Sequence, residues 1–147
     1  MGQSVVERAA TSREIVTIPT GATGLSNRPI DIRGYRSGHV LIPATWAGAD
    51  LAFKSSDTDS NAAIMREATG TGLSGATPVT FSFVRRDAAS APLLRVTNIP
   101  TSGGGWMPLP AALFYGHEFI QAMSVNTGSE AAVDQTGSPT LIFRFSA

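Results

Sequence analysis

Turn-forming clusters recur every eight to thirteen residues between residues 19 and 72 and at mostly wider intervals after that, and this spacing constrains the fold more than any other feature of the sequence. Clusters of Gly, Pro, Asn, Asp and Ser interrupt regular backbone hydrogen bonding, so only short elements fit between them. Short segments between regular turns are typical of a β-sandwich or barrel. The clusters lie at residues 19–21, 27–29, 36–38, 46–48, 57–60, 70–72, 102–105, 126–128 and 137–139.

The segments between these turns have the length of β-strands. In the last one, Leu141, Phe143 and Phe145 point one way while Thr140, Ile142 and Arg144 point the other, which is the two-residue period of a strand. We therefore predict an all-β protein, an antiparallel β-sandwich of eight or nine strands in a jelly-roll-like order. The expected strands are 14–18, 30–33, 39–42, 50–55, 62–66, 79–85, 93–98, 118–125 and 140–145.

One segment, residues 109–115, predicts a single short helix. Pro110 suits the first helical position, and Gly116 suits the C-terminal stop. Residues 1–12 have no hydrophobic periodicity, so we expect an extended N-terminal arm there. Residues 13–147 are expected to form one β-sandwich domain, because a chain of 147 residues with 42% hydrophobic residues suits a single core.

Composition excludes several classes of function. The chain has no cysteine, which excludes disulfides, thiolate nucleophiles and zinc–thiolate sites. Eleven Lys and Arg residues balance eleven Asp and Glu residues, so bulk charge does not favour nucleic acid or an anionic membrane as a partner. No apolar run approaches the roughly 20 residues of a membrane span, and the first residues lack the apolar core of a signal peptide.

Two short motifs and the two histidines give little support for a catalytic, nucleotide or metal site. Residues 70–75 spell G-x-G-x-x-G, but a strand pattern with a proline follows where a dinucleotide site needs a helix. Asp57 and Asp59 begin a calcium-loop pattern whose later Gly and Glu positions are both Ala; a partial cation site with Glu67 remains an alternative to a polar turn. The two histidines, His39 and His117, have no nucleophile motif beside them. We expect no catalytic residue, no metal and no cofactor.

The large and cationic side chains suggest contact surfaces. Ten of the eleven cations are Arg, a residue enriched at protein interfaces, although the codon bias of a GC-rich genome would produce the same ratio. Trp46 and Trp106 each follow a stretch of small residues. They suit either a sugar-binding platform or packing in the core or at a subunit seam, where Phe114 is also expected.

The order of the segments resembles that of a known group of proteins. Residues 39–46 (HVLIPATW) and 49–57 (ADLAFKSSD) give an I-P-A-x-W, L-x-F, S-x-D series, and 107–114 (MPLPAALF), 118–120 (EFI) and 140–145 (TLIFRF) continue it. Over about residues 28 to 146, this series resembles small β-sandwich virion proteins of tailed bacteriophages, most closely capsid decoration (cement) proteins.

The resemblance implies a structural role without catalysis. Such a protein is made in the host cytoplasm and binds the outer surface of the major capsid protein shell, commonly as a homotrimer with an N-terminal arm on the shell. An alternative is a head-fibre or tail accessory module that binds a host receptor or carbohydrate through Trp46, Trp106 and the glycine-rich loops. The residues we expect at the capsid contact are Val5, Val6, Glu7, Arg8 and Arg13.

Overall fold

The computed structural model describes residues 11–56, 80–86, 92–100 and 104–147, which form nine strands and one short 3-10 helix. The strands are β1 (Thr11–Thr17), β2 (Ile30–Asp31), β3 (Ser37–Ile42), β4 (Asp50–Ser56), β5 (Phe81–Phe83), β6 (Arg95–Val96), β7 (Gly105–Pro108), β8 (Phe119–Val125) and β9 (Thr140–Ser146). The helix η1 (Ala111–Phe114) lies between β7 and β8.

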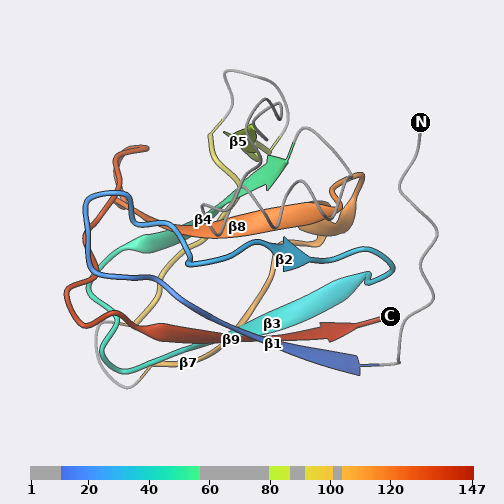
Figure 1. Ribbon diagram of the computed structural model, residues 1–147, viewed down its shortest axis with the longest axis horizontal. Helices are drawn as coiled ribbons and strands as arrows, with labels where there is room; N and C mark the ends of the chain where they lie inside the picture. Colours follow the sequence, from blue (N-terminus) through green and yellow to red (C-terminus); the bar gives the residue numbers. More distant parts are fainter. Residues whose placement is uncertain (1–10, 57–79, 87–91, 101–103) are drawn as a thin grey trace, which may run out of the picture.

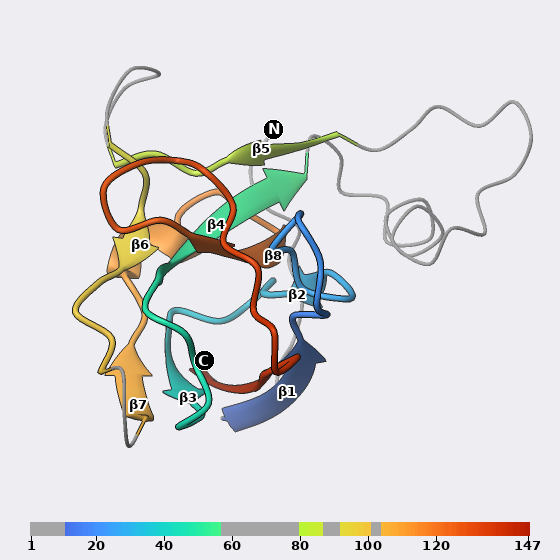
Figure 2. The ribbon, with the colours of Figure 1, turned by 90° about the vertical axis from the view of Figure 1, so that its left-hand side faces the viewer.

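The strands form two antiparallel sheets that pack face to face (Figures 1 and 2). One sheet has the order β1-β9-β3-β7, and the other has the order β2-β8-β4-β5, with β6 also paired to β4. Strands β5 and β6 pair with successive parts of β4 and therefore act as two halves of one edge strand. Counted this way, the chain has the strand order of a jelly roll, and the predicted all-β sandwich is confirmed.

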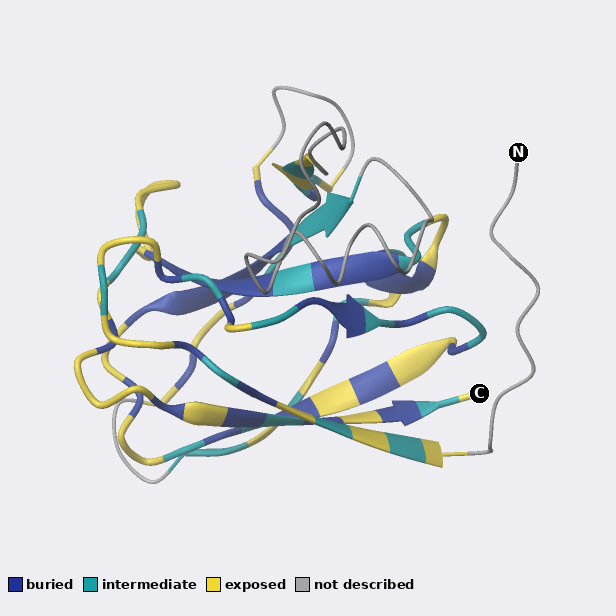
Figure 3. Cartoon of the chain, in the orientation of Figure 1, coloured by how far each residue is buried: buried dark blue, intermediate teal, exposed yellow. Residues whose placement is uncertain are grey.

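The core lies between the sheets and follows the alternation along each strand. In β9, Leu141, Phe143 and Phe145 are fully buried, while the residues between them face outward (Figure 3). Phe145 stacks on Tyr35 with ring centroids 5.3 Å apart and meets the edge of Phe114 at 6.0 Å, which closes one end of the core.

The sheet containing β2, β4 and β8 is buried on both faces. Leu51 and Phe53 enter the main core, whereas Ala52 points the other way, into a second apolar cluster. Met123 of β8 and Leu93 belong to that cluster. The outer face of this sheet is thus covered by apolar side chains from neighbouring segments, so the two sheets differ in how they meet solvent.

Strand β7 was not predicted, because Gly104 and Gly105 were interpreted as part of a glycine-rich loop. Both glycines have positive φ angles, of 55° and 135°. A Cβ on Gly104 would overlap the carbonyl oxygen of Ile42, so the turn places β7 close against β3 only because the residue has no side chain. Trp106 is consequently held in a strand and not in a loop.

The other differences concern element ends. The helix covers 111–114 and not 109–115, because Pro110 has an extended conformation (ψ 131°) and precedes the first helical residue. Strand β1 begins at Thr11, two residues before the expected start of the domain. Expected strand 62–66, the motif at 70–75 and the expected contacts Val5, Val6, Glu7 and Arg8 lie outside the described residues.

Candidate functional site

The outer face of the β1-β9-β3-β7 sheet carries a row of apolar side chains that crosses all four strands. Ile15 of β1 lies opposite Ile142 of β9, which lies opposite Leu41 of β3, which in turn pairs with Trp106 of β7. None of the four is buried, and Ile15 and Trp106 are 46% and 42% exposed. We call these residues the apolar row. Spaced at ~4.8 Å per strand, the row extends for about 14 Å across the surface.

A second row lies two residues from the apolar row along β1, β9 and β3. It consists of two arginines and a histidine. Arg13 lies directly opposite Arg144, and Arg144 lies opposite His39. All three side chains are exposed. We call them the cation row. Like charges on directly opposed residues destabilise a sheet, so this arrangement is locally unfavourable unless an anion lies against it.

The two rows are joined by a contact between Arg144 and Trp106. The guanidinium carbon lies 4.6 Å from the centroid of the indole ring. Strand β3 separates β9 from β7, so the two long side chains meet above it. A cation–π contact of this kind restricts the Arg144 side chain, and a guanidinium group can form a bidentate contact with a carboxylate.

No outward-facing residue of these four strands is acidic. The nearest carboxylate in the strands, Glu14, has the opposite orientation in β1 and accepts a 2.8 Å hydrogen bond from Arg28 at the sheet edge. Arg28 also donates to the carbonyl of Ile15, and Asn27 exchanges hydrogen bonds with the backbone of Thr17. This half of the β1 edge is therefore closed, and the open surface is the face of the sheet.

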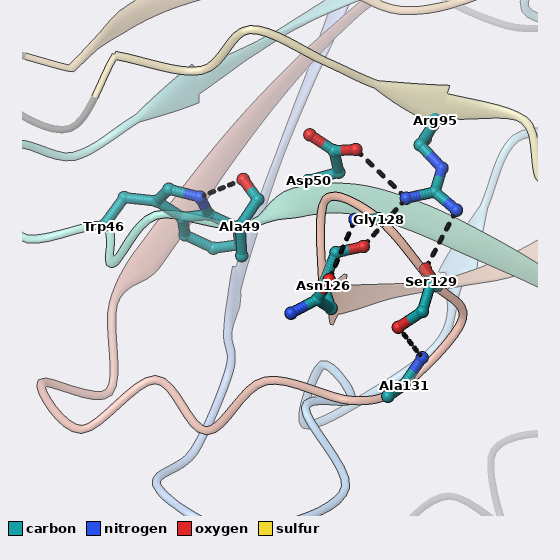
Figure 4. Close-up of polar contacts among 8 residues, drawn as sticks. All are labelled: Trp46, Ala49, Asp50, Arg95, Asn126, Gly128, Ser129 and Ala131. Atoms are coloured by element: carbon teal, nitrogen blue, oxygen red, sulfur yellow. Dashed lines mark hydrogen bonds and ion pairs between the residues drawn. The ribbon is translucent and has the colours of Figure 1, made fainter.

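The structure separates the residues that were predicted from the sequence. Arg13 belongs to the cation row and Trp106 to the apolar row. Trp46 is 2% exposed and donates from Nε1 to the carbonyl of Ala49 at 3.0 Å (Figure 4), and Phe114 packs on Phe145. The two tryptophans therefore do not form a common surface platform.

Sequence reasoning did not assign five members of the two rows to a contact surface: Ile15, His39, Leu41, Ile142 and Arg144. The alternation in residues 140–145 already placed Ile142 and Arg144 on the face away from the core. The alternation does not reveal the register between β9 and its neighbours, and it is this register that aligns the side chains into rows.

At one end of the sandwich, a part-buried ion pair ties β4 to β6 and to the turn after β8. Arg95 donates to Asp50 Oδ2 at 3.0 Å, to the carbonyl of Asn126 at 3.0 Å and to that of Ser129 at 3.1 Å (Figure 4). An open depression of about 470 Å³ lies beside Asp50 and is also lined by Thr97 and Thr127. Because Arg95 neutralises the carboxylate beside this depression, we assign the pair a structural role.

A second polar pair combines a hydroxyl with an imidazole. His117 Nδ1 lies 2.9 Å from Ser55 Oγ, and burial lowers the pKa of His117 below its ordinary value. Strand β8 begins two residues after His117 and pairs with β4, which positions the contact. His39 lies on the outer face of the other sheet and does not join this pair.

Within the described ranges there is no cluster of three His, Asp or Glu residues that could hold a metal ion. The proposed partial cation site of Asp57, Asp59 and Glu67 lies outside those ranges. The same described residues contain no helix long and apolar enough to cross a membrane.

The chain matches no protein-family model, no curated protein and no solved structure.

Proposed function

We propose that this chain is a structural protein of a tailed-bacteriophage virion, a capsid decoration protein that binds the outer surface of the major capsid protein shell and stabilises it. The observation that carries the proposal is the open face of the β1-β9-β3-β7 sheet, with its apolar row and cation row. A jelly roll with one covered sheet and one open, Arg-bearing sheet is suited to adhesion.

The proposed activity is mechanical. Removing apolar surface from water contributes roughly 25 cal/mol per Å², and a standard protein interface buries about 800 Å² per partner. A decoration protein that contacts two neighbouring capsid subunits adds this burial across their junction, so the subunits separate less readily under internal pressure. Association as a homotrimer would multiply the contacts on each shell without requiring a strong individual contact.

The alternative of a carbohydrate-binding fibre module relied on two surface tryptophans. Trp46 is in the core, and Arg144 lies over the ring of Trp106 with its guanidinium carbon 4.6 Å from the centroid. No specific observation now favours a sugar platform, so sugar binding becomes an outcome of the test.

Co-sedimentation tests the proposal. Purified protein is mixed with empty shells of the major capsid protein from the bacteriophage that encodes the chain, then centrifuged over a range of protein concentrations. We expect saturable pelleting at a fixed number of copies per capsid subunit, and a higher melting temperature for the decorated shells. Protein that stays in the supernatant at tens of micromolar, or that binds host polysaccharide and not shells, would overturn the proposal.

A further inference from the structure

We infer that the open face of the β1-β9-β3-β7 sheet binds a protein surface that is both acidic and aliphatic, with carboxylates placed against Arg13 and Arg144. The inference rests on the proposed function, since it describes the part of the shell that this face would contact. It goes further by naming the face, the residues and the chemistry of the partner.

Charge on the face sets the first requirement for the partner. Arg13 and Arg144 are opposed across β1 and β9, and His39 continues the row into β3. Neither arginine side chain has an acidic partner among the described residues, and none of the outward residues of the four strands is Asp or Glu. A carboxylate from a partner would relieve the repulsion within the sheet and form charge-assisted hydrogen bonds.

The apolar row sets the second requirement. Ile15, Ile142, Leu41 and Trp106 form a continuous strip beside the cations, and all four keep solvent contact. A partner surface with charged groups alone would leave these four apolar side chains in contact with water. Aliphatic side chains on the partner would remove the apolar row from water. An apolar centre with arginine beside it is a common composition of protein interfaces.

The same features argue against nucleic acid and lipid headgroups. The exposed cations of the row are few, and they lie beside an apolar strip instead of along a positively charged groove. Affinity for a polyanion depends on many phosphate contacts, and the chain as a whole has no net positive charge. A protein surface with a small number of carboxylates among aliphatic side chains matches a face that carries two arginines beside four apolar side chains.

The contact between Arg144 and Trp106 restricts the position of the Arg144 side chain on the sheet face. The guanidinium carbon lies over the indole ring, 4.6 Å from its centroid, so the cation–π contact restricts where the Arg144 head group can lie. A planar fork held in this way matches the two oxygens of a carboxylate. Arg144 therefore acts as a preorganised contact, while Arg13 is free of any side-chain partner among the described residues.

The test uses Arg13→Glu, because its effects on stability and on binding have opposite signs. A glutamate at position 13 lies opposite Arg144 and replaces a repulsion with an attraction. We expect the melting temperature to stay level or rise by about 1–4 °C. We expect binding to shells to weaken at least about tenfold, because a partner carboxylate would now face a carboxylate.

Two further variants control for charge and for side-chain loss. Arg86→Glu makes the same charge change near β5, on the other sheet, and should bind shells like the wild-type chain. Arg13→Lys keeps the charge and should retain most of the binding. Wild-type pelleting by Arg13→Glu overturns the inference while leaving the proposed function standing, and an equal loss with Arg86→Glu also overturns it.

A second measurement does not depend on shells and separates failure of the inference from failure of the proposed function. The wild-type chain is titrated by NMR with a peptide of alternating Asp and Val, with a Lys-Val peptide as control. We expect amide shifts to concentrate on β1, β3, β7 and β9 with the acidic peptide alone. Shifts on the other sheet, equal response to both peptides, or preferential binding of an oligonucleotide or of phosphatidylserine vesicles at this face would overturn the inference.

Discussion

Arg95 forms an ion pair with Asp50 in which the side-chain exposures are 15% for Arg95 and 6% for Asp50. Its three hydrogen bonds join β4, β6 and the turn after β8. Arg95→Ala would leave the Asp50 carboxylate buried without its counter-ion. We expect a loss of about 3–5 kcal/mol in the free energy of unfolding, measured by urea denaturation.

The matched control is Arg85→Ala, which removes a bidentate pair with Glu130. That pair is short, at 2.8 and 2.9 Å, but faces solvent. Water replaces such a pair at little expense, so this variant should unfold at nearly the wild-type urea concentration. Equal urea midpoints for the two variants would contradict the role given to burial at Arg95.

The burial of Trp46 and the exposure of Trp106 could not be predicted from the residues around them. Each follows small residues in the sequence, yet one is buried beside Ala49 and the other faces solvent beside Arg144. The difference arises from position in the fold: Trp106 is at an outward position of a strand, and Trp46 is in the turn after β3, at the end of the core. Burial of a large side chain outside a clear alternating pattern depends on strand register, which a local sequence window does not contain.

At the scale of elements, prediction worked where one face of a strand is buried. The alternation in residues 140–145 placed Phe143 and Phe145 in the core and Arg144 outside, as observed. It was less informative for β4, where Ala52 and Leu51 are both buried because the sheet is covered on two faces. Strand β7 was missed because its glycines indicate a loop, although Pro108 suits its place at a sheet edge.

His117, which lies two residues before β8, makes the stability of the fold depend on pH. Burial lowers the folded-state pKa of His117 below its ordinary value of about 6.5, so the unfolded chain binds this proton more readily than the folded chain. Stability therefore increases with pH through the range from the lowered pKa to about 6.5, and is lost as pH falls through that range. We expect the melting temperature to decrease between pH 7.5 and pH 5.5, and His117→Gln to flatten that decrease.

Ser55→Ala separates the effect of burial on the pKa of His117 from the effect of its contact with Ser55. It removes the 2.9 Å contact with His117 but leaves the ring in its half-buried position. Because burial is the cause of the lowered pKa, Ser55→Ala should keep the wild-type decrease in melting temperature on acidification. A flat profile in Ser55→Ala, or an unchanged profile in His117→Gln, would contradict this explanation.

At the scale of the whole molecule, the jelly-roll order determines which surface is available for a partner. It places β9 between β1 and β3, which aligns Ile15 with Ile142 and Arg13 with Arg144. These residues are far apart in sequence, so the two rows exist only once the sheet has formed. The sequence predicted the sandwich and Arg13 as a contact residue, but the face itself depends on pairings between distant segments.

The expected N-terminal arm can be tested separately from the open sheet face. Residues 1–10 precede β1, and the described members of the two apolar clusters all follow Thr11. Deletion of residues 2–10, stopping before the strand, should leave the melting temperature within about 2 °C of the wild-type value. If Val5, Val6, Glu7 and Arg8 contact the capsid, the truncated chain should bind shells about tenfold more weakly in co-sedimentation.

Combining the truncation with Arg13→Glu then distinguishes one contact from two. Changes at independent sites add in free energy, so the combined loss of affinity should equal the product of the two separate losses if arm and face bind different parts of the shell. A combined loss no larger than either single loss would mean that both act on one contact. Wild-type pelleting by the truncated chain would remove the arm residues from the interface and leave the open sheet face as the site of attachment.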